Sequence, residues 1–564
     1  MEEKKELSME VRLLLAFLLM GVVLFVTPYF YKQPPQPTPQ SAAKTTPANP
    51  ASAESGAGKT LAPPVPTIPP SGLPSQSAES EETITVDTDL YRVVFSNRGA
   101  VVRSWVLKAY KDQASKPVDL VNVRAAARVP APFSLTAAKG QALNPNPDSV
   151  LFQVERPDNL TVNFRYSDNR LSVKKSFRFL PKSYLVAVSS EVSQNGALIP
   201  HGFAWRGGFG DSTVVNPTKD QQALYYDVAN SKLQELAVKN AKDGPVSSGG
   251  QYSFAGLEDA YFAGVFLPEG RTSVELTEFA DPVSNAAGTD EQRVGASVGG
   301  EGSNAFTFFA GPKDYSLLHS INPKLDQLIN WGWFEFLAKP LFLALFWTAV
   351  HVTQHNYGWA IIVLTVVINM LLFPLKLTSM KSSRKMQAIQ PQVNAINDKY
   401  KGLSLKDPKQ SEKQTELMDL YKKHGYNPVG GCLPMVLQLP FFIAFYRMLM
   451  VTIELRGANF LWVHDLSQPE TIAIRILPLI LVVTQFVSQR MTPTPGVDPS
   501  QQKMMMFMPL VFGYMFYFFQ SGLVLYYLTS NLVGIAQQWI LNRISPPPVA
   551  VINVKPAPNK KKSR

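Results

Sequence analysis

The sequence predicts a multi-domain membrane protein in which an all-β domain precedes an α-helical transmembrane bundle. Three observations predict this architecture. Short segments of alternating apolar and polar residues fill residues 83–320, as is typical of strands. Apolar segments near the ~20 residues that a bilayer core requires follow between residues 357 and 541. One further apolar segment lies within residues 1–31. We therefore expect six spans, five of them in the bundle at 357–541.

The charge balance supports a membrane location. The chain has 54 Lys and Arg against 43 Asp and Glu, a formal net charge of +11. In a membrane protein this excess indicates cytoplasmic loops that face anionic lipid. Nucleic-acid binding is the alternative, but the basic residues flank apolar segments and no recognition signature occurs. Contact of a basic tail with ribosomal RNA stays open. A single cysteine, Cys432, excludes an intramolecular disulfide.

The N-terminal region predicts an anchor and a tether. The stretch Val11–Tyr31 is long for the apolar part of a cleaved signal peptide, and aromatic residues stand at 29–31 instead of a small-residue cleavage site. We expect residues 1–31 to be a retained anchor with a cytoplasmic N-terminus, and a cleaved signal peptide is the alternative. Residues 32–82 are rich in Pro, Ser, Ala and Thr and predict a disordered linker, because few apolar side chains offset the entropy of ordering.

Residues 83–320 predict a large β-sandwich. The stretches YRVVFSN and AVVRSWVL are expected to pair, as are LSVKKSFRFL and SYLVAVSSEV. Because this domain lies uninterrupted between apolar segments, it belongs on the side of the membrane opposite the N-terminus. His201, Glu258 and Asp259 are candidates for a sugar-like site, but nothing in their spacing assigns catalytic roles, so structural roles are favoured.

Residues 322–351 predict an amphipathic helix in the membrane interface. Glu335 and Lys339 interrupt its apolar part, and several tryptophans, including Trp333 and Trp347, suit the headgroup layer. A tilted spanning helix is the alternative, and it would reverse the topology of everything that follows.

The bundle at 357–541 contains five candidate spans. They are Tyr357–Leu375, Cys432–Val451, Thr471–Met491, Met504–Gln520 and Gly522–Leu541. The loop 376–431 and the tail 542–564 are strongly basic, so both are expected in the cytoplasm. Within the loop, apolar residues at helical spacing in 381–400 and 410–423 predict a cytoplasmic helical hairpin.

Polar residues inside the spans are the main functional signal. No candidate span has an interior Asp or Glu, so the carboxylate relay of proton-coupled carriers is missing. The uncharged polar residues are Thr365, Asn369, Gln438, Thr484, Gln485, Gln489, Tyr526, Tyr527 and Asn531. Some are expected to hydrogen-bond between helices, and others to line a cavity open to the cytoplasm. Asn369 and Gln438 lie at matching depths of about 8 and 9 Å from the cytoplasmic ends of their spans, which predicts one hydrated patch.

No catalytic or metal-binding constellation is evident. The six histidines are scattered, and we assign none of them to a metal site. The sequence therefore predicts neither a catalytic residue nor a cofactor or metal.

Four stretches carry a specific resemblance. They are NPVGGCLPMVLQLPFFIAFYRMLM, LWVHDLS, QQKMMMFMP and SGLVLYYLTSNL. Together they resemble the YidC/Oxa/Alb family of membrane protein insertases, and the anchor, tether and β domain resemble its Gram-negative form. The resemblance implies a bacterial inner-membrane protein whose periplasmic β domain is similar to a sugar-mutarotase supersandwich. It also implies an insertase and chaperone that is not an enzyme.

The resemblance further implies a mechanism. Five helices enclose a hydrophilic groove open to cytoplasm and lipid, which receives a nascent segment and releases its apolar part into the bilayer. The implied partners are nascent membrane proteins, the Sec translocon, the ribosome and anionic lipid, with no small-molecule substrate. The expected groove residues are Thr365, Asn369, Gln438, Arg447, Gln485, Tyr526 and Tyr527. The expected substrate or ribosome contacts are Lys381, Arg384, Lys385, Lys422, Lys423, Lys560, Lys561 and Lys562.

One departure from the family concerns charge. The family usually places an arginine, sometimes a lysine, at the groove position held here by Asn369. Arg447 is a candidate replacement, but it lies about 22 Å above Cys432 at the helical rise, nearer the periplasmic face. Snorkelling of Arg447 outward is the alternative.

Two other function classes remain as alternatives. A small-molecule carrier would predict internal repeats and a broken-helix ion site, and neither is recognisable. A tethered periplasmic carbohydrate-modifying enzyme would predict that the β domain alone turns over a sugar.

Overall fold

The computed structural model describes most of the chain after residue 74. The described residues are 75–544 except 138–142, 215–219, 271, 286–287, 401–408, 427–428 and 492–498. The predicted anchor 1–31, most of the linker 32–82 and nearly all of the tail 542–564 lie outside them. The chain divides into two compact units, and the larger, Gly72–Pro495 with Pro509–Arg564, contains the β domain and nearly all of the helices.

The described residues of the β domain form three antiparallel sheets. The first, in spatial order, contains β1 (Thr83–Asp87), β2 (Tyr91–Ser96), β3 (Val101–Lys111) and β4 (Pro117–Asp119). The second contains β13 (Lys232–Leu236), β12 (Gln222–Asp227), β15 (Tyr252–Glu258), β16 (Phe262–Pro268), β19 (Ser303–Pro312), β9 (Leu185–Gln194), β8 (Leu171–Phe179), β7 (Thr161–Ser167) and β6 (Gln153–Asp158), with β10 (Ala197–Leu198) on β9. The third contains β14 (Val246–Gly250), β17 (Val274–Ser284), β18 (Asp290–Gly299), β11 (His201–Trp205) and β5 (Ser134–Ala137). The predicted all-β domain is confirmed.

Both strand pairs expected from the sequence are present. Strands β2 and β3 pair antiparallel with Tyr91 opposite Leu107, and β8 and β9 pair with Val173 opposite Val192. Buried and more exposed residues alternate along β8, as its apolar and polar pattern predicts. Local alternation therefore sufficed to place these strands.

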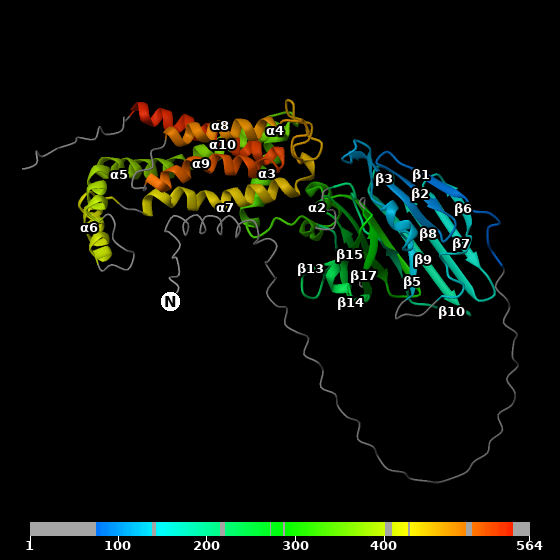
Figure 1. The fold of residues 1–564 in the computed structure, drawn as a ribbon. Coiled ribbons are helices and arrows are strands. Elements are labelled where there is room, and N and C mark those ends of the chain that lie inside the picture. Colours follow the sequence, from blue (N-terminus) through cyan, green and yellow to red (C-terminus); the bar gives the residue numbers. More distant parts are fainter. Residues whose placement is uncertain are drawn as a thin grey trace, which may run out of the picture. The chain divides into compact units, whose positions relative to one another are not determined.

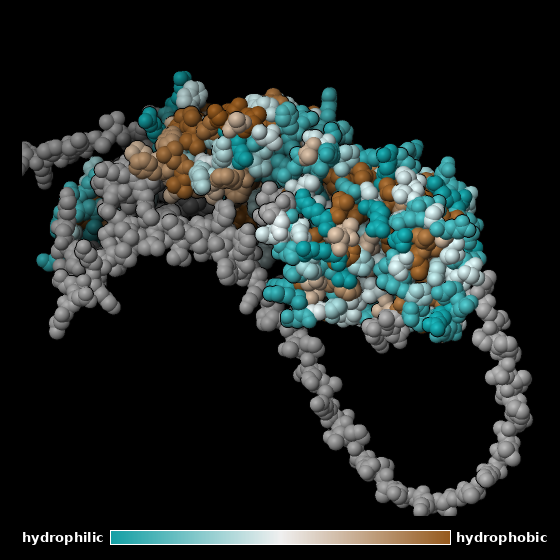
Figure 2. Space-filling model, turned by 45° about the vertical axis from the view of Figure 1, so that its right-hand side comes forward, coloured by the Kyte–Doolittle hydropathy of each residue, from teal (hydrophilic) through white to brown (hydrophobic). Residues whose placement is uncertain are grey.

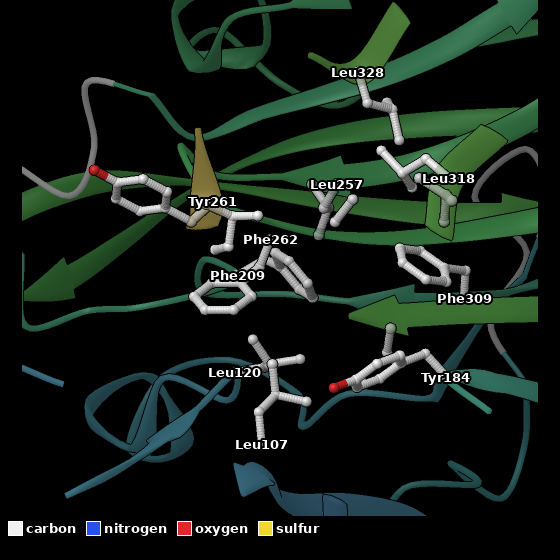
Figure 3. Packing of buried hydrophobic residues seen from close by; sticks show 14 of the residues in the cluster. Leu107, Leu120, Tyr184, Phe209, Leu257, Tyr261, Phe262, Phe309, Leu318 and Leu328 are labelled. Carbon is white, nitrogen blue, oxygen red and sulfur yellow. The ribbon is translucent and has the colours of Figure 1, made fainter. Parts of the chain in front are cut away.

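The core of the domain is rich in aromatic and branched side chains. Figure 3 shows Phe209 and Phe262 between Leu257 on one side and Leu107 and Leu120 on the other. Leu318 and Leu328 lie beyond Leu257 in the same view (Figure 3), and they come from α2 (Tyr315–Ile321) and η4 (Pro323–Leu328). The chain leaving the last strand is thus anchored to the domain by apolar packing before it enters the bundle. Among the described residues, the 3₁₀ helices η1 (Val123–Ala127) and η3 (Val238–Ala241) lie earlier in the domain.

The predicted boundaries on both sides of the β domain shift. Gln76 pairs with Ser167, and Glu81 forms an ion pair with Arg98, so the end of the predicted linker already contacts the domain. On the other side, residues 322–351 are not one helix. The 3₁₀ helix η4 ends at Leu328, and α3 (Glu335–His351) begins only after Gly332, whose positive φ of 75° stops a continuous helix.

A helix overlaps each of the five predicted apolar segments. These helices are α4 (Tyr357–Leu371), α7 (Val429–Val451), α8 (Ile476–Met491), α9 (Pro499–Phe516) and α10 (Ser521–Ile544), and the 3₁₀ helix η5 (Ile453–Leu455) follows α7. Figure 1 shows α3, α4, α7, α8 and α10 side by side, and α10 contacts α4, α7 and α8. None of the described helices combines the length and the sustained apolar character that a membrane crossing needs. The six spans therefore stay a prediction.

The exposed surface of the helical bundle is more apolar than that of the β domain. Figure 2 shows hydrophobic residues across the exposed surface of the helices, whereas hydrophilic residues dominate the visible face of the β domain. The exposed large apolar side chains include Leu371, Val483, Val511, Tyr514 and Leu532. An apolar patch of this kind indicates an interaction surface and not a surface in contact with water.

Two further helices form a hairpin beyond α4. Helix α5 (Phe373–Lys399) and helix α6 (Lys409–Lys423) pack through Met386, Ile389 and Val393, against which Leu417, Leu420 and Tyr421 lie. These are the residues whose helical spacing predicted the hairpin. Its location in the cytoplasm stays a prediction.

Candidate functional site

Polar groups from α4, α5 and α10 converge on Asn369, whose side chain is almost fully buried. Lys376 Nζ donates a hydrogen bond to Asn369 Oδ1 at 2.6 Å, and Ser530 Oγ donates to the same oxygen at 3.3 Å. The Asn369 amide donates to the backbone oxygen of Thr365 at 2.8 Å. Gln537 Nε2 donates to the backbone oxygen of Asn369 at 3.3 Å. These five residues are called the Asn369 cluster below.

Helical spacing explains how the cluster assembles. Thr365 and Asn369 are four residues apart, and Ser530 and Gln537 are seven apart, so each pair lies on one face of its helix. Helices α4 and α10 are packed together, which brings the two faces into contact. The break between α4 and α5 at Leu372 lets the lysine of α5 turn back toward the last turn of α4.

The cluster has an uncompensated charge and an unused acceptor. No described carboxylate lies within ion-pair distance of Lys376, and α4, α8, α9 and α10 contain no Asp or Glu in their sequences. Gln537 Oε1 is buried and has no hydrogen-bond partner among the described residues. Buried polar groups are normally satisfied, so an orphaned acceptor in the same cluster as a cation without a described counter-ion indicates a place for another polar group.

A second set of polar contacts joins α8 to α10. Asn531 Nδ2 donates to Thr484 Oγ1 at 2.9 Å, and Tyr527 hydrogen-bonds with Gln485. Thr484 in turn donates to the carbonyl of Leu481. The sequence therefore identified residues that do meet between these helices, here as interhelical hydrogen bonds.

The two predicted groove tyrosines are packed among aromatic rings. Tyr526 is stacked on Phe445 of α7 with 4.0 Å between ring centroids and 12° between planes. Tyr527 is stacked on Phe516 of α9 at 4.8 Å. Geometry of this kind stabilises helix packing, so Tyr526 and Tyr527 act at least partly as packing residues.

Gln438 and Arg447 lie on α7, outside the Asn369 cluster. Gln438 is half-buried. Arg447 Nη2 donates to Asn330, to its side-chain oxygen at 3.2 Å and its backbone oxygen at 3.4 Å. Asn330 belongs to the segment between η4 and α3, so the described contacts of Arg447 are with this segment and not with Asn369.

Comparison with known proteins assigns the chain to a family. The model described as "60Kd inner membrane protein" matches residues 338–547, and the one described as "YidC periplasmic domain" matches residues 83–344. A membrane protein insertase YidC from Syntrophus aciditrophicus is 33% identical over 573 residues, covering 95% of this chain and all of the relative. The chain belongs to the YidC family of membrane protein insertases. One from Ralstonia nicotianae is 33% identical, covering 90% of this chain and 92% of the relative.

A solved YidC structure is also similar. A crystal structure of an active YidC insertase with its first transmembrane domain resolved is 19% identical and covers 83% of this chain and 94% of that one, at a TM-score of 0.35. The likeness of the β domain to a mutarotase supersandwich stays a prediction.

Several basic residues expected to contact substrate in this YidC-family chain have partners within the protein. Arg384 donates to Asn542 Oδ1 at 3.2 Å, which joins α5 to the end of α10. Lys385 Nζ donates to the backbone oxygen of Gly425 at 3.3 Å. Lys422 and Lys423 are exposed at the end of α6. The side chain of Lys381 and the residues Lys560, Lys561 and Lys562 lie outside the described part of the chain.

The polar candidates of the YidC periplasmic domain are engaged in structural contacts. His201 Nε2 lies 2.7 Å from Ser190 Oγ and 3.1 Å from Asn304 Nδ2, and burial lowers the pKa of His201 to about 4. Glu258 pairs with Lys313 at 3.3 Å, and burial nevertheless raises the pKa of Glu258 to about 7.

Asp259 is saturated by backbone donors. Its Oδ1 accepts from the N–H groups of Tyr261 and Phe262, and its Oδ2 accepts from the N–H of Asp211. A carboxylate held by three main-chain donors shapes a turn and has little capacity left for a ligand. His201, Glu258 and Asp259 therefore have structural roles in the described part of the domain. The sequence had favoured such roles over a sugar-like site.

Sequence reasoning missed three members of the Asn369 cluster. Lys376 directly follows a predicted span, so it was assigned to the basic loop, and Ser530 and Gln537 were not singled out. The spacing of seven residues between Ser530 and Gln537 was an available signal, because it places two polar groups on one face of the helix.

Proposed function

We propose that this YidC-family insertase receives the polar flank of a nascent hydrophobic segment at the Asn369 cluster and releases the apolar part sideways into lipid. The Asn369 cluster is the observation that carries the proposal. It gathers a cation, amides and a hydroxyl inside a bundle whose outer surface is apolar. Polar groups in such a place lower the free-energy cost of bringing a hydrophilic flank into the membrane.

The proposed topology has six spans, with both termini and the α5–α6 hairpin in the cytoplasm of a bacterium and the β domain in the periplasm. Outward apolar side chains on the bundle, such as Val483 and Val511, support contact with lipid tails. Trp333, Phe336 and Trp347 are exposed on or next to α3, which supports its placement in the headgroup layer. The N-terminal span is proposed from the sequence alone.

The proposed cycle requires no nucleotide. Apolar burial in the bilayer supplies the driving force for release, at roughly 25 cal/mol per Å² of apolar surface. The exposed Lys422 and Lys423 and the basic tail are proposed to contact the ribosome and anionic lipid. We further propose a chaperone role and cooperation with the Sec translocon, on the strength of the family resemblance.

A liposome assay tests the proposal. The purified chain is reconstituted, a two-span substrate with a short loop is synthesised outside, and insertion is measured by protection of the loop from protease. We expect insertion above empty liposomes, and a marked loss in Asn369→Leu. The matched control is Asn394→Leu on α5, where the asparagine is exposed and the loss of a polar group has little effect.

The outcomes separate the alternatives. Failure of the wild-type chain to exceed empty liposomes would overturn the insertase proposal. Equal insertion by Asn369→Leu and wild type would overturn the assignment of the groove to the Asn369 cluster. A version without residues 83–320 is expected to keep insertion, whereas a carbohydrate-modifying enzyme would lose its function with that domain.

A further inference from the structure

We propose that Lys376 supplies the positive charge of the groove and favours nascent segments that carry an acidic residue beside their hydrophobic stretch. The inference rests on the proposed function, because it concerns what the same cluster recognises. It names a specificity-determining residue that lies on α5, and not on α4 with Asn369.

The position of Lys376 is defined by the cluster. Its ammonium group lies 2.6 Å from Asn369 Oδ1, and Ser530 donates to the same oxygen. Asn369 is itself held by Thr365 and Gln537. An amide oxygen is neutral, so Asn369 orients the ammonium group without neutralising it. Lys376 is half-buried, which leaves part of the side chain accessible to a partner.

No described acidic residue competes for this charge. The first acidic residue after Lys376 along α5 is Asp398, about 33 Å away at the helical rise. Before it in sequence, the nearest acidic residue is Glu335, at the start of α3. A half-buried cation without a described counter-ion is unfavourable, so Lys376 is suited to bind an anionic group from outside the protein.

A second observation points to a polypeptide ligand. Gln537 Oε1 belongs to a side chain that is 4% exposed, it lies in the same cluster, and it has no donor among the described residues. A lone cation and a lone acceptor together match a carboxylate side chain and a main-chain N–H group. An Asp or Glu at the end of a hydrophobic segment presents both groups within one residue.

Arg447 does not provide this charge at the cluster. The described hydrogen bonds of Arg447 are with Asn330, which precedes α3, and Gly332 lies close to the Arg447 side chain. Among the described residues, Lys376 is therefore the cation that touches Asn369. The charge that the family places at position 369 is moved to the following helix in this chain.

The test compares two substrates that differ by one residue, Asp or Asn, at the flank of the same hydrophobic segment. Each is inserted by full-length wild type, Lys376→Met and Lys376→Arg in liposomes of neutral lipid and in liposomes with anionic lipid. We expect Lys376→Met to lower insertion of the Asp substrate about tenfold and to affect the Asn substrate much less, since a charge-assisted hydrogen bond is lost. Lys376→Arg is expected to retain the preference.

Two further variants control for folding and position. Lys399→Met removes a lysine from the same helix whose ion pair with Glu416 is exposed, and we expect the wild-type ratio between the two substrates. The double variant Asn369→Arg with Lys376→Met restores a cation on α4, and we expect it to recover the preference for the Asp substrate. Recovery shows that charge, and not a local fold defect, was lost.

The results distinguish this inference from the proposed function. If wild type inserts both substrates but Lys376→Met leaves their ratio unchanged, the inference is wrong and the insertase proposal stands. If Lys376→Met reduces both substrates equally and only in anionic liposomes, Lys376 binds a lipid headgroup and the inference is again wrong. If wild type inserts neither substrate, the proposed insertase function itself is wrong, and the inference about Lys376 is wrong with it.

Discussion

Glu278 offers a sharp test of the electrostatics of the β domain. Its side chain is fully buried in β17, opposite Val246 of β14 and Ala296 of β18. Neither carboxylate oxygen has a hydrogen-bond partner among the described residues. Burial without a partner disfavours the charged form and raises the pKa of Glu278 from 4.5 to about 7. Glu278→Met, which keeps a similar volume, should therefore stabilise the protein.

The size and pH dependence of the effect follow from this pKa. Between pH 4.5 and 7 the folded state holds a proton that the unfolded state has lost, so wild-type stability falls as pH rises through this window. Above pH 7 the penalty is complete and amounts to about 3 kcal/mol. Glu278→Met lacks the titrating group. Its free energy of unfolding should exceed that of wild type by about 3 kcal/mol at pH 8, and by much less at pH 5.

Urea unfolding of the full chain in detergent, followed by tryptophan fluorescence, measures this difference at both pH values. Trp105 and Trp205 lie in the core of the β domain and report on its unfolding. Glu275→Met is the matched control on the same strand, where the side chain is half-buried, and we expect a change within about 0.5 kcal/mol. A variant Glu278→Met that is less stable than wild type at pH 8, or equally stabilised at both pH values, would refute the reasoning.

Two further predictions concern buried polar contacts. Asp259→Ala leaves three main-chain N–H groups without their acceptor, so the free energy of unfolding should fall by about 3 kcal/mol or more in the same urea assay; a loss under 1 kcal/mol would contradict the assignment. Arg456→Met removes the buried partner of Asp211, and about 3–5 kcal/mol should be lost, visible as a lower unfolding temperature. Adding Asp211→Asn to Arg456→Met should recover part of that loss, because the uncompensated charge disappears; an additive loss would show that the ion pair is not the cause.

Local patterns in the sequence predicted much of the fold, because strands and helices each have a characteristic spacing of apolar residues. Strands β8 and β9 and the hairpin of α5 and α6 depend on periodicities of two and 3.6 residues, which a short stretch already displays. The position of helix α10 follows equally from one apolar run. Breaks in the pattern were harder to place. The interruption around Gly332 was missed because a positive φ at a glycine is decided by packing on both sides.

The candidate site was predicted only in part. Thr365 and Asn369 share a helix face by spacing alone, and Thr484, Gln485, Tyr527 and Asn531 do meet between α8 and α10. The depth estimate also placed Arg447 far from Asn369, and its hydrogen bonds to Asn330 agree with that separation. What the depth estimate cannot supply is the rotation of each helix about its axis, which determines the partners of each polar group.

The sequence by itself determined that a β domain is followed by a helical bundle, that the bundle contains polar groups, and that position 369 is an asparagine, where the family resemblance implies a cation. Only the tertiary structure showed that a cation, Lys376, contacts Asn369. Lys376 stands just beyond a predicted span, where one-dimensional reasoning assigns it to a cytoplasmic loop. The turn at Leu372 brings its ammonium group back to Asn369, and packing of α10 adds Ser530 and Gln537. Contacts between residues far apart in the chain depend on the packing of whole helices, and no local pattern encodes them.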